Sequence, residues 1–231
     1  MLLFSLECSA AAASAAIYRD EKLLGEEFLN VPQTHSVTLL PMAKSLLEHT
    51  GISPAQIDYY AVSRGPGSFT GLRIGIAAIK GLAFPDDTPC IGVSTPEAIA
   101  YGLLGFEGTV IPMMDARCGQ VYTALFQGKD GRLTRLSEDE ALPLSELKEK
   151  LKSCTGPLWL CGDGAHLGLA AWGEELPVRM APAHLCCQRA SAVGLAAMRH
   201  LGEAVSPAAL VPCYLRPANA MTLAERQHKA E

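Results

Sequence analysis

The chain has 231 residues, of which 49% are hydrophobic and 19% are charged, and its formal net charge at pH 7 is −5. This apolar content supports a buried core and excludes disorder over most of the length, while no apolar run approaches the ~20 residues that a membrane-spanning helix needs. The negative charge argues against a protein that binds nucleic acid without a partner, because contacts with phosphates need a basic surface.

The N-terminal 18 residues are apolar and end in small side chains, as a secretory signal peptide does. However, no Lys or Arg precedes the apolar run and Glu7 interrupts it, which is not the pattern of a signal. The eight cysteines are scattered and form no C-x-x-C pair, so they indicate neither a disulfide scaffold nor a zinc site. We therefore expect reduced, mostly buried thiols in a cytoplasmic protein.

Residues 1–105 are predicted to form a first α/β domain. Three short apolar runs separated by polar turns predict an antiparallel meander, and a run at helical spacing then predicts a helix that Gly51 ends. A glycine-rich loop leads into a second helix, for which Thr70 is the expected cap. The predicted strands are residues 2–6, 12–18, 23–31, 57–63 and 90–93, and the predicted helices are residues 36–48, 70–84 and 96–104.

Residues 106–231 are predicted to repeat this pattern in a second domain. Its first strand ends in Asp115, and an irregular, slightly basic tail follows from Pro212. The predicted strands are residues 109–114, 121–126, a segment around Leu133, and 158–161, and the predicted helices are residues 144–151, 165–172 and 189–201.

The two halves match in the kind and order of their elements. Glu7 of the first half corresponds to Asp115 of the second, and residues 65–67 correspond to residues 162–164, although no repeat is visible letter by letter. The order β-β-β-α-β-α-β-α is that of a ribonuclease-H-like α/β domain. We therefore predict two such domains, 1–105 and 106–231, each a mixed sheet flanked by helices.

The segment GPGSFTGLRIGIAAIKGLA, residues 65–83, follows a strand and opens a helix, a context in which backbone N–H groups can hold an anion. It lacks the lysine of a P-loop, and Gly71 comes one residue late for a dinucleotide fingerprint. The alternative is packing, because Gly67, Gly71 and Gly75 are four residues apart and Ala78 continues the same side. We favour a close helix contact, within the domain or with a partner.

Glu7 and Asp115 end the first strands of the two halves, where actin-like ATPases place carboxylates that bind phosphate and metal. Such a pair could hold Mg²⁺ through water. However, residues 8–11 lack the glycines that let backbone approach a phosphate, and Arg117 could simply pair with Asp115. Inherited structural hairpins are therefore favoured, and a small ATP-binding ATPase or kinase that uses Glu7 and Asp115 stays as the alternative function.

Other catalytic patterns find little support in the sequence. The six histidines form no H-x-x-x-H or H-E-x-x-H face for zinc. Ser68 lacks the glycine two residues on that a nucleophile elbow requires. The sequence therefore shows no catalytic constellation.

Three segments resemble the bacterial TsaB (YeaZ-like) family over nearly the whole chain. They are VSRGPGSFTGLRIGIAAIKGLA, VIPMMDARCGQVYTALF and the closing PCYLRP. The resemblance implies a two-domain actin-like (ASKHA) fold and a non-catalytic role in making N6-threonylcarbamoyladenosine at position 37 of tRNAs that read codons beginning with A. Older naming of the wider family also suggests a metallopeptidase.

The same resemblance implies a complex. The larger homologous subunit TsaD would carry the metal site and transfer the threonylcarbamoyl group, and the small P-loop ATPase TsaE would join the assembly. ATP or ADP and the metal ion would then belong to the partner subunits and not to this chain, which would meet tRNA only through the complex. A homodimer is expected when the partner is absent.

The resemblance also assigns residues. It puts the two N-terminal helices, around residues 36–48 and 70–84, in the subunit interface. The residues that it places at a signature loop and helix start are Gly65, Pro66, Gly67, Ser68, Thr70, Gly71 and Arg73. One departure is Glu7-Cys8-Ser9, where the family usually has Asp-Thr-Ser, and it makes an independent nucleotide site less expected. The interface is expected at His35, Leu39, Leu40, Ala43, Leu47, Gly67, Thr70, Gly71, Arg73, Ile74, Gly75 and Ala78, and a vestigial nucleotide cleft at Glu7, Ser9, Asp115, Arg117, Gly162 and Gly164.

Overall fold

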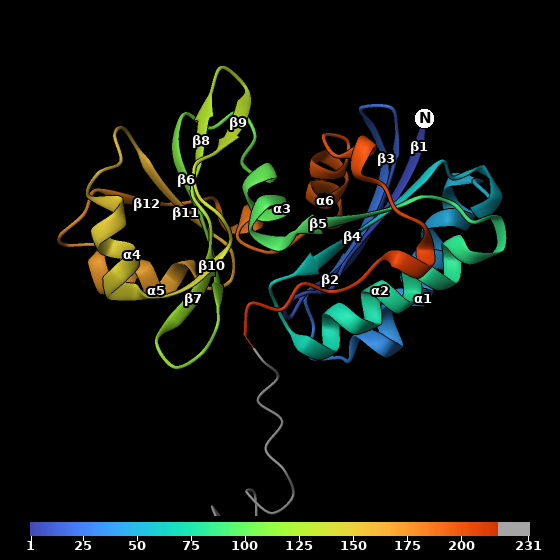
Figure 1. The fold of residues 1–231 in the computed structure, drawn as a ribbon, viewed down its shortest axis with the longest axis horizontal. Coiled ribbons are helices and arrows are strands. Elements are labelled where there is room, and N and C mark those ends of the chain that lie inside the picture. Colours follow the sequence, from blue (N-terminus) through green and yellow to red (C-terminus); the bar gives the residue numbers. More distant parts are fainter. Residues whose placement is uncertain (217–231) are drawn as a thin grey trace, which may run out of the picture.

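A computed structural model describes residues 1–216 and contains two mixed sheets, each flanked by helices (Figure 1). The predicted tail from residue 217 onward lies outside the described residues. The elements of the first half are β1 (Leu2–Glu7), β2 (Ala13–Arg19), β3 (Lys22–Leu29), α1 (His35–Thr50), β4 (Tyr59–Gly65), α2 (Phe69–Ala83), β5 (Cys90–Ser94) and α3 (Thr95–Tyr101).

The first sheet has the strand order β3-β2-β1-β4-β5. Strands β1, β2 and β3 pair antiparallel, which confirms the predicted meander, whereas β1 and β4 pair parallel. Helices cover both faces of β1, so it is a nearly continuous apolar run rather than an alternating one.

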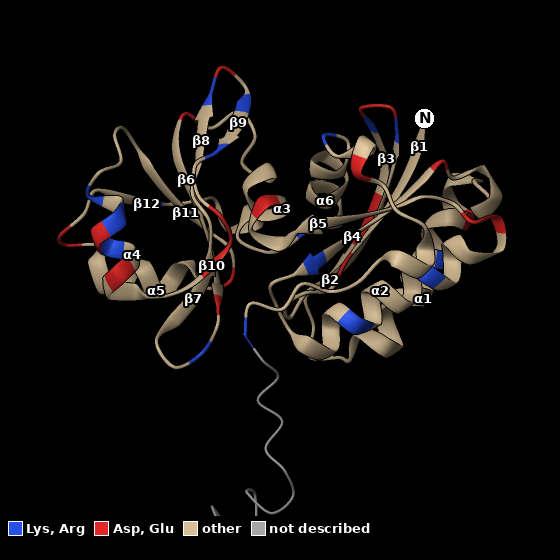
Figure 2. Ribbon diagram, viewed as in Figure 1, with Lys and Arg blue, Asp and Glu red and all other residues tan. Residues whose placement is uncertain are grey.

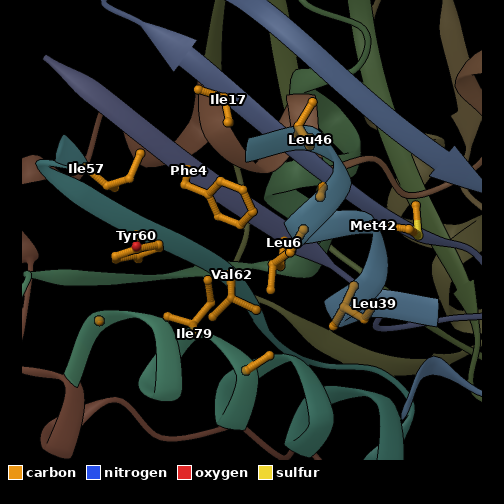
Figure 3. Packing of buried hydrophobic residues seen from close by; sticks show 14 of the residues in the cluster. Phe4, Leu6, Ile17, Leu39, Met42, Leu46, Ile57, Tyr60, Val62 and Ile79 are labelled. Atoms are coloured by element: carbon orange, nitrogen blue, oxygen red, sulfur yellow. The ribbon is translucent and has the colours of Figure 1, made fainter. Parts of the chain in front are cut away.

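The larger core cluster lies between this sheet and helices α1 and α2 (Figure 3). Phe4 and Tyr60 meet there edge to face, with ring centroids 5.8 Å apart. Leu39 of α1 and Ile79 of α2 are fully buried against the same strands. Burying each such side chain contributes about 2 kcal/mol, so this cluster holds both helices firmly on the sheet.

The second half repeats the topology of the first. Its sheet runs β10-β7-β6-β11-β12, with β6 pairing antiparallel to β7 and parallel to β11, as β1 pairs with β2 and β4. The elements are β6 (Gly108–Asp115), β7 (Gln120–Thr123), β8 (Phe126–Lys129), β9 (Arg132–Arg135), β10 (Glu140–Pro143), α4 (Leu144–Leu151), β11 (Leu158–Cys161), α5 (Ala165–Trp172), β12 (Val178–Met180) and α6 (Ala190–Ala197).

Several predicted elements needed correction. The single strand predicted over residues 121–126 is wrong, because β7 pairs with the end of β6 whereas β8 crosses to its beginning. The short strands β10 and β12 were missed, since three or four residues at a sheet edge carry little apolar pattern. The cap of α2 is Ser68 rather than Thr70, because the Ser68 hydroxyl accepts a hydrogen bond from the Gly71 N–H at 3.2 Å.

Helix α6 is shorter than the predicted helix over residues 189–201, and it packs on the first sheet. The Ser5 hydroxyl donates to the carbonyl of Ala190 at 2.7 Å, and a Cβ at Gly194 would lie 2.7 Å from the ring of Tyr18. This close approach requires the small residues of α6. The second predicted domain, residues 106–231, thus contains a helix that packs on the sheet of the first predicted domain, residues 1–105. Within residues 1–216, no helix combines the length and the apolar character needed to span a membrane.

Candidate functional site

A cleft of about 560 Å³ opens between the two sheets, at the ends of β1 and β6. It brings together the hairpin after β1, the loop before α2, the hairpin after β6 and the last described residues of the chain. The lining residues are Ser9, Ala10, Ala11, Pro66, Gly67, Ser68, Phe69, Met114, Asp115, Ala116, Arg117, Tyr122, Asp163, Cys213, Tyr214, Leu215 and Arg216.

Glu7 is sealed beneath this cleft and does not line it. Its carboxylate is fully buried, where it accepts hydrogen bonds from the Ser63 hydroxyl and, at 2.5 Å, from the Ser9 N–H. Burial raises the pKa of Glu7, and the hydrogen bonds from Ser63 and Ser9 offset part of that rise. The first of the two expected acids is therefore a structural group in the core.

Asp115 is exposed and lines the cleft. Its carboxylate accepts a hydrogen bond from the backbone N–H of Arg117 at 2.7 Å. The expected side-chain pair between Arg117 and Asp115 is thus replaced by a contact to the backbone, in a hairpin where Arg117 has a φ of 62°. Of the two expected acids, Asp115 alone faces the cleft.

Glycines beside the cleft pack on the chain's own backbone. A Cβ at Gly162, whose φ is 91°, would lie 2.3 Å from the Met113 carbonyl, and one at Gly164 would lie 2.8 Å from the Asp115 nitrogen. A Cβ at Gly67 would lie 2.7 Å from the carbonyl of Ser9, which itself lines the cleft. These glycines allow the turns and hairpins around the cleft to pack closely on one another. Of the expected cleft residues, Ser9, Asp115 and Arg117 line the cleft, whereas Glu7 lies beneath it.

The small-residue side of α2 also faces inward. A Cβ at Gly71 would lie 2.1 Å from the Cys8 carbonyl, and one at Gly75 would lie 2.8 Å from the Cys8 sulfur. This side of α2 therefore packs mainly on the hairpin after β1, within the first half, and a Cβ at Gly71 would also come within 3.4 Å of His35 at the start of α1. Half of the residues expected at the subunit interface have little exposed surface, although two of them, Ala43 and Leu47, line a groove beside α1. The six are Leu39, Ala43, Leu47, Gly71, Gly75 and Ala78.

The remaining expected interface residues do reach the surface. Leu40 is 52% exposed, Thr70 and Arg73 are exposed, and His35, Gly67 and Ile74 are partly buried. Two further apolar side chains, on α1 and just after α2, are exposed and were not among the predicted interface residues. These are Val37, 63% exposed on α1, and Phe84, 77% exposed just after α2. The signal for Val37 was its spacing with Leu40 and Lys44 along one side of α1, whereas no pattern in the sequence marks Phe84.

An apolar groove of about 950 Å³ lies beside α1 and α2. Figure 2 shows α2 as mostly uncharged, and its charged residues are Arg73 and Lys80. Apolar side chains gathered along an open groove are a feature of protein–protein contacts. The groove is lined by Leu40, Pro41, Ala43, Lys44, Leu47, Glu48, Gly51, Ile52, Ser53, Pro54 and Leu82.

The cysteines and other potential metal ligands add no second site. All eight cysteines are free, and burial raises the pKa of Cys90 to about 11. In the part of the chain that the structure describes, no three His, Cys, Asp or Glu side chains converge to hold a metal ion.

Comparisons with known proteins bear on this geometry. The sequence profile of the family described as "TsaD: tRNA N6-adenosine threonylcarbamoyltransferase" matches residues 29–154. The chain is similar to the "tRNA threonylcarbamoyladenosine biosynthesis protein TsaB" of Bacillus subtilis, with 31% identity over 95% of this chain and 96% of the relative. The protein of that name from Escherichia coli is 34% identical over 71% of this chain and 72% of its own length.

A solved structure agrees with the fold. The crystal structure of an uncharacterized protein with similarity to peptidase YEAZ from Pseudomonas aeruginosa superimposes with a TM-score of 0.80 at 28% identity. The match covers 93% of this chain and 99% of that one. Together with the repeated strand order, it confirms the predicted two-domain actin-like (ASKHA) architecture.

Proposed function

The chain belongs to the TsaB family of tRNA threonylcarbamoyladenosine biosynthesis proteins, and we propose that it acts there as a non-catalytic subunit that pairs with TsaD. The modified base would be adenosine 37 of tRNAs that read codons beginning with A. The protein would work in the cytoplasm and would contact tRNA only within the complex, because its net charge of −5 does not suit RNA binding alone.

The apolar groove beside α1 and α2 carries this proposal. Leu40 is 52% exposed and Val37 is 63% exposed, so the outer side of α1 presents apolar side chains to solvent. Covering such apolar surface is favourable by roughly 25 cal/mol per Å², which gives a partner subunit a driving force to dock there. The partner's surface should therefore be apolar as well.

The match to the TsaD family supports the choice of partner. Residues 29–154 match that profile, and they include α1 and α2. Related chains can pair by placing the same elements against each other about a two-fold axis, in a self-complementary contact. A TsaD subunit could thus present equivalent helices to this groove, and a second copy of this chain could do so in its absence.

The cleft supports a non-catalytic role for this chain. Glu7 is fully buried and accepts hydrogen bonds from Ser63 and Ser9, so it does not reach the cleft. An ATPase or kinase that uses both Glu7 and Asp115 would therefore lack one of its two acids in the cleft. We assign ATP or ADP and the metal ion to the partner subunits TsaD and TsaE.

Depletion of the protein in its own cells tests the proposal. The threonylcarbamoyladenosine content of total tRNA, measured by liquid chromatography and mass spectrometry, should fall to a few per cent of the normal level. Wild-type protein should restore the nucleoside, whereas Leu40→Asp should not. Leu169→Asp is the matched control and should also restore it, because Leu169 is similarly exposed (40%) but lies on α5 of the second half, away from the groove. Unchanged nucleoside after depletion would contradict the proposed function.

A further inference from the structure

Residues 205–216 form a strap that contains one short 3-10 turn, Pro207–Ala209, runs beside α2 and ends between the two sheets, where Figure 1 shows it in red. It begins as a bridge to β5, in which Cys90 and Val205 exchange hydrogen bonds of 2.8 and 2.9 Å. Lys80 of α2 then donates to the carbonyl of Ala208 at 3.1 Å, and the buried Leu210 enters the core. The strap is thus fastened to the first half over most of its length.

The fit between strap and first half is close at Gly65. The N–H of Cys213 donates to the carbonyl of Arg64 at 2.7 Å. Gly65 has a φ of 124°, and a Cβ there would lie 2.1 Å from the carbonyl of Cys213. A side chain at residue 65 would therefore push the strap off the end of β4.

An aromatic and arginine cluster holds the strap at the start of α2. The ring of Tyr214 stacks on Phe69 with centroids 4.7 Å apart, and the guanidinium of Arg73 lies 3.8 Å from the centroid of Phe69. The Nε of Arg73 donates to the hydroxyl of Tyr214 at 3.0 Å. Stacking, cation–π and hydrogen-bond contacts thus combine to anchor the strap beside the cleft.

The last described residue crosses to the second half. The guanidinium of Arg216 donates to the carbonyl of Ala116 at 2.9 Å, in the hairpin that follows β6. Residues 213–216 and this hairpin line the same cleft. A separate contact joins the halves through α3, where Glu97 pairs with Arg135 of β9 at 3.1 Å.

We propose that the strap is a latch that ties the two halves together at the edge of the cleft, through the hydrogen bond from Arg216 to Ala116. The cluster of Tyr214, Phe69 and Arg73 holds the strap on the first half. Arg216 of the strap then binds the hairpin of the second half through its hydrogen bond to Ala116. A charged donor makes this bond stronger than a neutral one. The latch is a property of the isolated chain and goes beyond the proposed function. Because α2 carries the strap, a change at that helix would reach the cleft through Arg73.

Hydrogen–deuterium exchange of the full chain, without any partner, tests the latch. In Arg216→Ala the hairpin of residues 115–121, whose Ala116 and Gln120 amides are hydrogen-bonded within it, should exchange about tenfold faster, because an ionic hydrogen bond that restrains it is lost. Tyr214→Phe removes one hydroxyl and should give a smaller increase of about threefold in the same segment. Arg132→Ala, an exposed arginine of β9, is the matched control and should leave the hairpin unchanged.

Equal hairpin exchange in Arg216→Ala and Arg132→Ala would overturn the latch. A uniform increase over both sheets would also overturn it, since Arg216 would then stabilise the whole fold and not the cleft. Neither result depends on TsaD, so a failed latch and a failed partner-binding proposal are distinguished by separate measurements.

Discussion

The two halves share one topology but place their equivalent acids in opposite environments, one buried and one exposed. Glu7 and Asp115 both end the central strand of a sheet whose next parallel neighbour leads into a glycine turn and a helix. Glu7 is fully buried and accepts from Ser63, whereas Asp115 is exposed in the cleft and accepts from a backbone N–H. Position in a duplicated fold therefore does not determine chemistry. The local packing around each acid does.

The helices that cover the halves differ as well. In the first half α1 and α2 have 16 and 15 residues, whereas α4 and α5 of the second half have eight each. The longer pair covers its sheet and still leaves an apolar groove at the surface. The first half thus combines a buried acid with an open apolar groove.

The largest expected loss of stability tests a feature that the two halves share, a glycine packed against a backbone carbonyl. Gly71→Ala should destabilise the fold by at least about 3 kcal/mol, because the new methyl group would meet the Cys8 carbonyl at 2.1 Å. Gly162→Ala should cost a similar amount in the second half, since its Cβ would lie 2.3 Å from the Met113 carbonyl at a φ of 91°. Urea denaturation followed by circular dichroism measures both.

Gly81→Ala is the matched control for the glycine series. Gly81 lies on α2 with nothing within 4 Å of its added Cβ, so alanine should stabilise the helix by about 1 kcal/mol. If Gly71→Ala were as stable as Gly81→Ala, the close packing of α2 on the hairpin after β1 would be disproved.

A pH series sharpens the difference between the acids. Because burial raises the pKa of Glu7 above its ordinary value of 4.5, its contribution to stability is complete below pH 4.5 and is lost as the pH rises through the folded-state pKa. Glu7→Gln cannot ionise. As the pH rises above 4.5, the free energy of unfolding of the wild type should therefore fall relative to that of this variant, by up to about 1.4 kcal/mol per pH unit. A constant difference from pH 5 to pH 8 would show that Glu7 ionises normally.

The smallest expected effect concerns the second acid. Asp115→Asn should change the free energy of unfolding by less than about 0.5 kcal/mol, because the residue is exposed and the amide oxygen can still accept from the Arg117 N–H. The same urea series measures it. A loss above about 2 kcal/mol would mean that the two acids play equivalent structural roles.

Much of the architecture could be predicted because local patterns determine it. The meander of β1 to β3 and the helices α4 and α5 follow from apolar spacing and turn residues, and the equivalence of Glu7 with Asp115 follows from element order. The break between β7 and β8 could not be predicted, since Ala124 and Leu125 are as apolar as their neighbours and the break depends on pairing along β6.

The site residues were harder to predict, because spacing alone does not say which side of a helix faces the core. Gly71 and Gly75 formed a plausible contact surface in sequence, but the nearby hairpin at Cys8 occupies it. The strap that brings Tyr214 to Phe69 joins residues 145 positions apart in the sequence and gives no local signal.

Binding to the TsaD subunit from the same organism, followed by isothermal titration calorimetry, tests the central claim most directly. Leu40→Asp places a charge in the apolar groove and should weaken binding at least about 30-fold, because an uncompensated charge would be buried there. Leu169→Asp makes the same change on the second half and should bind within about threefold of the wild type. Equal affinity for Leu40→Asp and the wild type would contradict docking at the groove, and so would an equal loss for both variants.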